Sequence, residues 1–333
     1  MALRIVFCGT PAFAVPSLRR LTREPDFDVV GVVTQPDRPR GRGREVQSPA
    51  VKGAAVAAGI PVYQPEKIKS EEAHQYFRRQ APDAAVIIAY GQIVSQRLID
   101  VPRLGWINLH ASLLPKYRGA APINWAIING EARTGVTTMQ IDAGLDTGPV
   151  LLKYETEIGA DETAPELTAR LAEAGAPLIV ETLRKLERDE IRPTPQDNSQ
   201  ASFAPPLRKS DGWIEWELSS ELIYARIRGL QPWPGASTTF RGKRCQVWGK
   251  PLHAAERGAL LPGKRVGVVA KSGPREFTAP GTIRQVAAGA VLVSCGSGDA
   301  LMLESVQLED RKQVTAREFA NGARLAPGER FGG

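Results

Sequence analysis

Cysteine and histidine are both scarce in this chain, which has three of each among its 333 residues. Cys8, Cys245 and Cys295 are too far apart for the paired spacing of a zinc site and too few for a fold held by disulfide bonds. The sequence therefore predicts a protein of a reducing compartment that binds no metal. It also leaves few candidates for a catalytic imidazole.

Long apolar runs are absent as well. No stretch approaches the ~18 apolar residues that a membrane-spanning helix requires. Met1 leads almost at once into the apolar Ile5–Phe7, without the h-region of a signal peptide. Apolar residues (42%) and charged residues (24%) occur in the proportions of a soluble globular protein. We expect it in the cytoplasm. We also expect two domains, because the chain exceeds the usual size of one hydrophobic core.

The positive charge is unevenly distributed along the chain. None of the net charge of +7 comes from residues 1–206, which have 24 basic and 24 acidic side chains, whereas residues 207–333 have 19 and 12. This asymmetry favours a polyanionic partner for the C-terminal part. The alternative is a charged surface that serves only solubility.

A G-x-G-x-x-G motif is missing from the start of the chain. The apolar runs Leu3–Cys8 and Val29–Val33 flank an amphipathic stretch at Ser17–Thr22, and this order predicts a β-α-β unit. The turn after the first strand reads Gly9-Thr-Pro-Ala-Phe13, which disfavours a nicotinamide cofactor. The sequence thus predicts an α/β fold with a Rossmann-like, doubly wound and mostly parallel sheet.

Further elements extend this first domain, which we place at residues 1–190. The pattern predicts helices at 51–58, 71–80, 122–128 and 166–188, the last interrupted near Gly175 and Pro177. It predicts strands at 61–63, 84–89, 105–110, 136–141 and 151–157, of which the last two should form a hairpin. Strands 84–89 and 105–110 should end at the same sheet edge, where open parallel sheets bind ligands.

Four arginines stand among prolines and glycines at residues 35–44: Arg38, Arg40, Arg42 and Arg44. Proline and glycine exclude a regular element there, so we expect an exposed, mobile loop. The arginines repel one another unless an anion gathers them, which favours a loop that grips phosphate. The alternative is a solvated basic loop without a ligand.

The composition changes after the first domain. Residues 191–206 contain four prolines among polar residues and are predicted to form a linker. In residues 207–333 the pattern predicts a helix at 219–230 and short strands at 237–240, 245–248, 266–269, 281–286, 290–295 and 301–306. Such spacing is typical of a small β-barrel.

A candidate catalytic pattern lies at residues 105–119, which read GWINLHASLLPKYRG. Asn108 and His110 are two residues apart on a strand and therefore on one face of the pleat. The later loop Asp142–Gly148 supplies two carboxylates, Asp142 and Asp146. An amide, an imidazole and a carboxylate together suit oxyanion stabilisation and proton transfer, although each alone is more often structural. The other histidines, at positions 74 and 253, are expected on the surface.

These motifs resemble the folate-dependent formyltransferases. The resemblance rests on N-x-H-x-S-L-L-P-x-Y-R-G followed by G-x-D-T-G, and on FCGTP, TQPDRP, AYG and PWP elsewhere in the same order, so it covers most of the chain. It implies transfer of a formyl group from 10-formyltetrahydrofolate to an amine. It also implies an OB-like fold for the C-terminal barrel.

The resemblance and the chemistry together assign roles to individual residues. Asn108 and His110 are expected to stabilise the oxyanion, and Asp146 to orient His110 and relay a proton through water. Folate contacts are implied for the turn and the neighbouring strand end, namely Ser112, Leu113, Leu114, Pro115, Ile88, Tyr90 and Asp142. The two leucines could equally be core residues, and Asp142 could equally cap a turn.

The accepting amine is implied to be that of initiator methionyl-tRNA, whose formylation serves translation initiation. The arginine loop and the basic barrel favour a tRNA, since a small amine needs neither. Contacts to tRNA are expected from Arg38, Arg40, Arg42, Arg44, Lys209, Arg241, Lys243 and Arg244.

Two alternatives remain. The first is a formyltransferase for a small amine, such as a phosphoribosyl glycinamide or an amino sugar. The second is a nucleic-acid-binding protein whose Rossmann-like half is idle, which the intact Asn108, His110 and Asp146 disfavour. We expect a monomer.

Overall fold

The computed structural model describes residues 1–40, 45–252, 278–287, 290–296 and 298–332. The chain forms two compact units. The first consists of Met1–Ile123, Ala132–Gly159 and Glu166–Pro206, and the second of Asn124–Glu131, Ala160–Pro165 and Leu207–Gly333.

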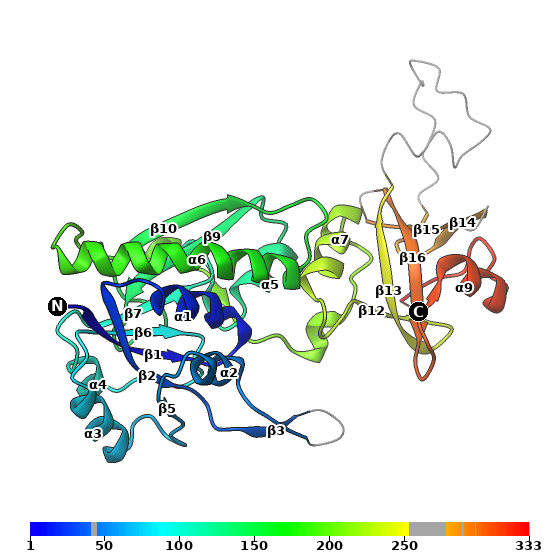
Figure 1. Cartoon of the computed structure of the whole chain (residues 1–333). Helices are drawn as coiled ribbons and strands as arrows, with labels where there is room; N and C mark the ends of the chain where they lie inside the picture. Colours follow the sequence, from blue (N-terminus) through cyan, green and yellow to red (C-terminus); the bar gives the residue numbers. More distant parts are fainter. Residues whose placement is uncertain (41–44, 253–277, 288–289, 297, 333) are drawn as a thin grey trace. The chain divides into compact units, whose positions relative to one another are not determined.

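The first unit is built on a seven-stranded sheet (Figure 1). Its strands are, in spatial order, β10 (Val150–Glu157), β9 (Arg133–Gln140), β7 (Trp106–His110), β6 (Ala84–Ile88), β1 (Leu3–Gly9), β2 (Phe27–Val33) and β5 (Val62–Tyr63). The five strands from β7 to β5 are parallel, whereas β9 runs antiparallel to both of its neighbours, β7 and β10. The predicted Rossmann-like, mostly parallel sheet is confirmed.

Helices cover both faces of the sheet, and side chains of β7 pack against helices on each face. Trp106 packs on Phe77 of α3 (Glu71–Gln80), with ring centroids 5.0 Å apart, and its Nε1 donates to the Leu98 carbonyl of α4 (Gln96–Ile99) at 2.8 Å. Leu109, on the opposite face, packs against Gly175 of α6 (Ala164–Glu187), where a Cβ would lie 2.4 Å from a leucine methyl. Burial on both faces explains the continuous apolar runs of the central strands.

The predicted interruption of the long helix near Gly175 and Pro177 is wrong, because α6 is continuous over 24 residues. A proline inside a helix removes one backbone hydrogen bond and strains the preceding turn. Close packing of Gly175 on Leu109 stabilises the helix at this point. Tertiary contacts therefore outweigh the local preference.

The prediction that the arginine segment has no regular element is also wrong. β3 (Arg38–Arg40) and β4 (Glu45–Gln47) pair antiparallel as a short hairpin, with Arg38 opposite Gln47 and Pro39 opposite Val46. In a two-stranded ribbon both strands are edge strands, where a proline is tolerated because its nitrogen can point away from the partner. Arg42 and Arg44 lie outside the described residues.

The second unit contains an antiparallel sheet. Its strands are, in spatial order, β12 (Ser237–Phe240), β13 (Lys243–Pro251), β16 (Ala300–Leu308), β15 (Ala290–Ser294) and β14 (Ile283–Ala287), with β17 (Val314–Thr315) beside β16. Five predicted strands and the helix α7 (Ser220–Gly229) are confirmed, whereas the predicted strand at 266–269 lies outside the described residues. α9 (Ala316–Ala323) was not predicted, although Thr315 and Glu318 form the capping box that marks its start.

The C-terminal residues join the two edges of this sheet. Phe331 forms a backbone bridge to Phe240 of β12, and Arg330 forms one to Thr282, which directly precedes β14. Phe331 is fully buried, and its ring lies 5.1 Å from that of Phe240 and 6.3 Å from that of Phe319. This connection supports the predicted small barrel.

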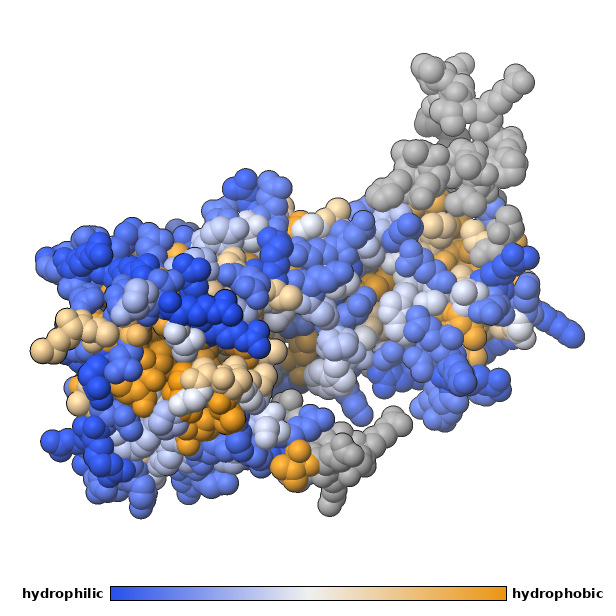
Figure 2. Space-filling model, in the orientation of Figure 1, coloured by the Kyte–Doolittle hydropathy of each residue, from blue (hydrophilic) through white to orange (hydrophobic). Residues whose placement is uncertain are grey.

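Hydrophilic residues cover most of the face that Figure 2 shows, and apolar residues gather over α1 (Val15–Leu21) and α2 (Ala50–Ala57). Small side chains of these two helices, among them Val15, Ala50 and Ala54, line a groove of about 500 Å³. Among the described residues, no helix has the length and apolar character to cross a membrane.

Candidate active site

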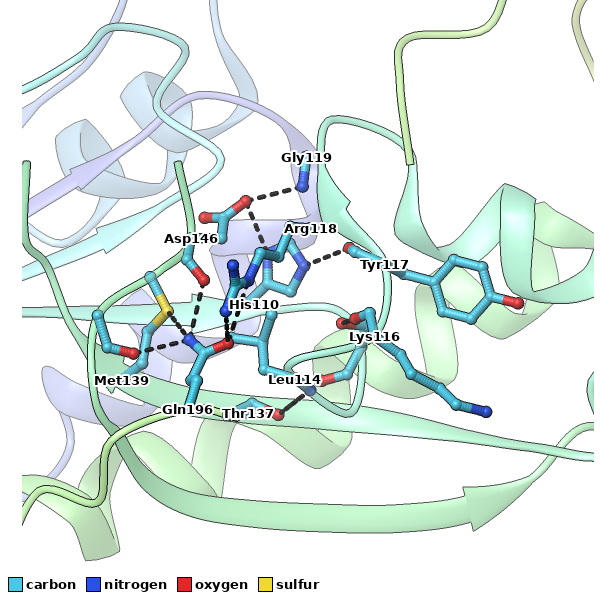
Figure 3. A network of polar contacts seen from close by, with 12 residues as sticks. His110, Leu114, Lys116, Tyr117, Arg118, Gly119, Thr137, Met139, Asp146 and Gln196 are labelled. Atoms are coloured by element: carbon cyan, nitrogen blue, oxygen red, sulfur yellow. Dashed lines mark hydrogen bonds and ion pairs between the residues drawn. The ribbon is translucent and has the colours of Figure 1, made fainter. Parts of the chain in front are cut away.

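The sheet register brings the predicted catalytic residues together. Asn108 and His110 of β7 lie opposite Met139 and Thr137 of β9, and β9 pairs antiparallel with β10. The predicted hairpin is thus confirmed, and its connection, residues 141–149, carries Asp146 next to His110 (Figure 3). Asn108 is buried, as is His110.

The two ring nitrogens of His110 have different surroundings. Nε2 lies 2.8 Å from the Tyr117 carbonyl oxygen, and because a carbonyl only accepts, Nε2 carries a proton. Nδ1 faces Asp146 Oδ2 at 3.7 Å, which is beyond hydrogen-bond length. Only 7% of the His110 side chain and 15% of the Asp146 side chain are exposed. The pair is therefore close and shielded but not in direct contact.

Asp146 adopts an unusual backbone conformation. Its φ of 52° lies in the left-handed region, which aspartate tolerates better than most residues. Oδ2 accepts a hydrogen bond from the Gly119 amide at 2.8 Å. Gly119 is itself at φ 120°, and a Cβ there would lie 2.8 Å from the Ala204 carbonyl oxygen, so the glycine is required for this approach.

Residues 191–206, predicted from composition to be a linker, pack closely beside this site within the first unit. Thr194 exchanges two backbone hydrogen bonds of 2.8 Å with Val150. β11 (Phe203–Ala204) pairs with β8 (Arg118–Gly119), and Gln196 donates to the carbonyl oxygens of Asp146 and Gly148. Sequence reasoning missed these contacts. Arg118 lies inside the catalytic motif, whereas nothing in the sequence distinguishes Gln196 from its polar neighbours.

The turn predicted to contact folate is held by hydrogen bonds of its own. The Ser112 hydroxyl donates to the Lys116 carbonyl at 2.6 Å, and both Ser112 and Leu114 are fully buried. The Leu114 amide donates to Thr137 Oγ1 at 3.2 Å, and its carbonyl accepts from Lys153 Nζ at 2.6 Å. The Leu114 side chain therefore occupies a core position, which is the alternative left open by the sequence.

The strand end and the loop show two further arrangements. Ile88 and Tyr90 are buried, and the Tyr90 carbonyl accepts from Thr10 Oγ1 at 2.9 Å and from Gln35 Nε2 at 3.1 Å. Burial raises the pKa of the Tyr90 hydroxyl. Asp142 accepts from the Gly144 amide and the Thr147 hydroxyl, which is the turn cap that the sequence also allowed.

The basic residues predicted to contact tRNA differ in their surroundings. Arg38, Lys209, Arg241 and Lys243 are exposed. Arg38 lies 3.6 Å from Glu66, and Arg241 pairs with Glu329. Arg244 is half-buried, donates to Ser237 Oγ and lies over the Trp213 ring, 5.5 Å from its centroid. Arg40 ends β3, and the remaining two arginines of the loop lie outside the described residues.

The prediction that His74 lies on the surface is wrong, because the residue is only 7% exposed. It lies with Ala73 and Phe77 on the buried face of α3, at the helical spacing that buries one stripe of side chains. His253 lies outside the described residues. Within the described part of the chain, no three His, Cys, Asp or Glu residues cluster as metal ligands would.

Two solved structures that share the fold of this chain cover nearly all of it. WlaRD, a sugar 3N-formyl transferase, aligns with a TM-score of 0.63 at 17% identity, covering 94% of this chain and 100% of its own. HypX from Aquifex aeolicus in complex with tetrahydrofolic acid aligns with a TM-score of 0.58 at 16% identity, covering 99% of this chain and 49% of its own. At these identities the similarity establishes the fold alone.

The sequence comparisons are more specific. Residues 3–183 match the formyl transferase family and residues 206–324 its C-terminal domain. The methionyl-tRNA formyltransferase of Solibacter usitatus is 51% identical over 99% of both chains, and that of Acidobacterium capsulatum is 48% identical over 99% of this chain and 100% of its own. The chain therefore belongs to the formyl transferase family, among the methionyl-tRNA formyltransferases.

Proposed function

We propose that this protein transfers the formyl group of 10-formyltetrahydrofolate to the amino group of initiator methionyl-tRNA. The observation that carries the proposal is identity of 45–51% over nearly the whole chain with relatives named methionyl-tRNA formyltransferase. A structural neighbour in complex with tetrahydrofolic acid supports a folate as the formyl donor. The product, formylmethionyl-tRNA, would serve translation initiation in the cytoplasm.

The reaction requires four events. The neutral amine of the methionyl group attacks the formyl carbon, which forms a carbon–nitrogen bond and places negative charge on the formyl oxygen. That oxyanion must be stabilised, and a proton must move from the attacking nitrogen to N10 of the folate. The bond from the formyl carbon to N10 then breaks, and tetrahydrofolate leaves.

Buried donors next to a carboxylate suit these events. We assign the oxyanion to the Asn108 amide and to protonated His110, whose Nδ1–H can donate to it because Nε2 already donates to the Tyr117 carbonyl. The Asp146 carboxylate, 3.7 Å from Nδ1, would orient and stabilise the imidazolium, and it would relay the proton from the attacking nitrogen to N10 through a water molecule. No covalent intermediate is needed.

We further assign the folate to the turn Ser112–Pro115 with Ile88, Tyr90 and Asp142, in the first unit. Residues 1–190 would form the catalytic domain, and residues 207–333 a tRNA-binding domain with a net charge of +7. Because phosphate contacts are independent of base sequence, these basic residues supply affinity without specificity. The protein would act as a monomer.

An assay of formyl transfer to methionyl-tRNA tests the proposal. With 10-formyltetrahydrofolate as donor, we expect product from methionyl-tRNA and none from free methionine. An amino sugar and a phosphoribosyl glycinamide serve as the small-amine controls. Faster formylation of either small amine than of methionyl-tRNA would overturn the assignment of the acceptor.

A further inference from the structure

Gln196 uses its complete hydrogen-bonding capacity between two parts of the first unit. Its Nε2 donates to the carbonyl oxygens of Asp146 at 2.9 Å and Gly148 at 2.7 Å. Its Oε1 accepts from Nε and Nη2 of Arg118, at 3.2 and 2.8 Å. Two donors and two acceptor positions are all that a primary amide offers.

The partners fix the orientation of this amide. A flipped Gln196 would turn its oxygen toward two carbonyl oxygens and its NH₂ group toward a guanidinium, so all four hydrogen bonds would be lost at once. Arg118, which binds the oxygen of this amide, is itself held in place, because it is 4% exposed and its Nη2 also donates to Asn198 Oδ1 at 2.8 Å. Figure 3 shows this chain of contacts from Arg118 through Gln196 to Asp146.

The contacts constrain the backbone that presents the Asp146 carboxylate. Asp146 is held at φ 52°, a conformation that costs free energy unless the surroundings stabilise it. Gln196 binds the carbonyl of Asp146 itself and that of Gly148, and therefore restrains the peptide groups around this residue. The carboxylate then reaches both the Gly119 amide and the neighbourhood of His110 Nδ1.

Arg118 and His110 are also connected through the chain itself. Tyr117, the residue before Arg118, accepts from His110 Nε2, and its amide donates to Ser202 Oγ at 2.9 Å. The Arg118 amide donates to the Ser202 carbonyl at 2.8 Å. Residues 196–202 thus contact both Tyr117, whose carbonyl binds His110, and the loop that carries Asp146.

We propose that Gln196 and Arg118 are positioning residues that hold the Asp146 carboxylate at its working distance from His110. The proposal deepens the proposed function and rests on it. In this view residues 191–206 are a structural part of the active site and not only a connection to the second unit. Gln196 contacts no reacting atom and acts through Asp146.

The test is Gln196→Glu in the full-length protein. A glutamate keeps the shape and the acceptors for Arg118, but it has no N–H donors for the two carbonyls. We expect the single-turnover rate of formyl transfer to fall by about 10²-fold, the scale of misplacing a reacting group by an ångström. The KM for methionyl-tRNA should change by less than roughly threefold, because substrate contacts are retained.

Gln200→Glu is the matched control. Gln200 lies four residues further along the same segment, is exposed, and donates to Asp197 instead of to the site. The same charge change there should leave the rate unchanged. A loss of rate equal to that of Gln196→Glu would show a general effect of charge and would overturn the proposal.

A double-mutant cycle separates positioning from a merely structural role. If Gln196 acts through the Asp146 carboxylate, Gln196→Glu should cost less than about threefold when it is added to Asp146→Asn. Independent, multiplicative losses would overturn the proposal. Gln196→Met, which removes every polar atom of the side chain, should repeat the result, and loss of folding in both variants would count against a positioning role.

The cycle also distinguishes failure of this inference from failure of the proposed function. Wild-type protein that forms no formylmethionyl-tRNA would refute the function. A fully active wild type with an equally active Gln196→Glu variant would refute only the positioning role.

Discussion

Two polar, proline-containing segments of the first unit, residues 35–47 and 191–206, differ in the contacts that their described residues make. In the first, the described contacts gather at its base, where Asp37 binds Lys52 and Gln64, while Arg38 is 64% exposed at its side chain. In the second, Gln196 and Ser202 bind the backbone of the active site.

The difference lies in the backbone groups that lie next to each segment. Residues 191–206 run beside peptide groups that lack a partner in their own element, such as the Arg118 amide and the Asp146 carbonyl. Buried peptide groups must be paired, so a polar segment next to them becomes ordered. Polar, proline-rich composition therefore predicts the absence of a long element but not the absence of a fixed structure.

The largest effects should come from the proposed catalytic residues, of which Asp146 is bound at its carbonyl by Gln196. We expect Asn108→Ala, His110→Ala and Asp146→Asn each to lower turnover by on the order of 10²-fold or more, the usual scale for an oxyanion donor or an acid–base group. The measurement is kcat for formyl transfer, with circular dichroism to verify folding.

The same variants in combination give a further check. Residues that act as a unit lose activity non-additively, so the triple variant should be little worse than the poorest single one. Near-normal turnover of a folded His110→Ala protein would remove His110 from the mechanism.

The next largest effect, on rate more than on binding, should come from the arginine hairpin, by which we mean β3, β4 and the residues between them. Arg42 lies on the domain that carries the site, and we propose that it places the aminoacylated end of the tRNA. Arg42→Ala should then lower single-turnover rate, by up to roughly 10²-fold, more than it weakens tRNA binding. Lys243→Ala with Arg244→Ala should do the reverse and flatten the salt dependence of binding by about one unit per lost phosphate contact.

Equal losses confined to affinity in both variants would reduce the hairpin to another patch of positive charge. The Arg244→Ala substitution has a second effect, since Arg244 lies over Trp213 and its loss also removes that packing. Lys243→Ala alone is therefore the cleaner control, because Lys243 is exposed.

These two sets of residues also show what the sequence could and could not predict. The placement of Asn108 and His110 on one face, and of Asp146 in a hairpin beside them, follows from local periodicity and the alternation of strands. Gln196 could not be found in this way, because it lies 50 residues from Asp146 and in a polar segment. Its role depends on the carbonyl groups that the tertiary structure places next to it, those of Asp146 and Gly148.

The errors at α6 and His74 have a related cause. Local rules assign a break to Pro177 and exposure to a histidine in a polar helix. The structure instead packs Gly175 on Leu109 and turns His74 inward with Phe77. Tertiary packing determines both the continuity of α6 and the burial of His74. A short stretch of sequence does not reveal such packing.

A moderate effect, on stability in the presence of folate, should come from the turn at residues 112–115, which residues 191–206 contact. The Ser202 amide donates to the Pro115 carbonyl at 3.3 Å, so residues 112–115 are fixed from both sides. If this turn holds the folate, a folate analogue at 100 times its Kd should stabilise the native state by about 2.7 kcal/mol, and the shift should be lost in Leu113→Asp. Leu113 is half-buried, which makes it a safer site than the fully buried Leu114.

Thermal unfolding with and without the analogue measures this shift. Val56→Asp is the control, because Val56 is exposed on α2 and should keep the full protection. Protection that survives in a folded Leu113→Asp protein would place the folate elsewhere.

The smallest effect should come from the base of the arginine hairpin, and it should depend on pH. Asp37 accepts from Lys52 Nζ at 2.5 Å and from Gln64 Nε2 at 2.9 Å, and these contacts, that of Lys52 first, lower the pKa of its carboxyl from the usual 3.8. A carboxyl whose pKa is lower in the folded than in the unfolded state stabilises the fold fully above its unfolded pKa. That stabilisation is lost as the pH falls through the folded pKa. Asp37→Asn should therefore unfold at a lower temperature than wild type near neutral pH, and the difference should close below pH 3.8. Lys52→Met, which removes the main partner, should give the same profile in midpoints measured across this range, whereas a constant difference at every pH would show that the carboxylate does not anchor the hairpin.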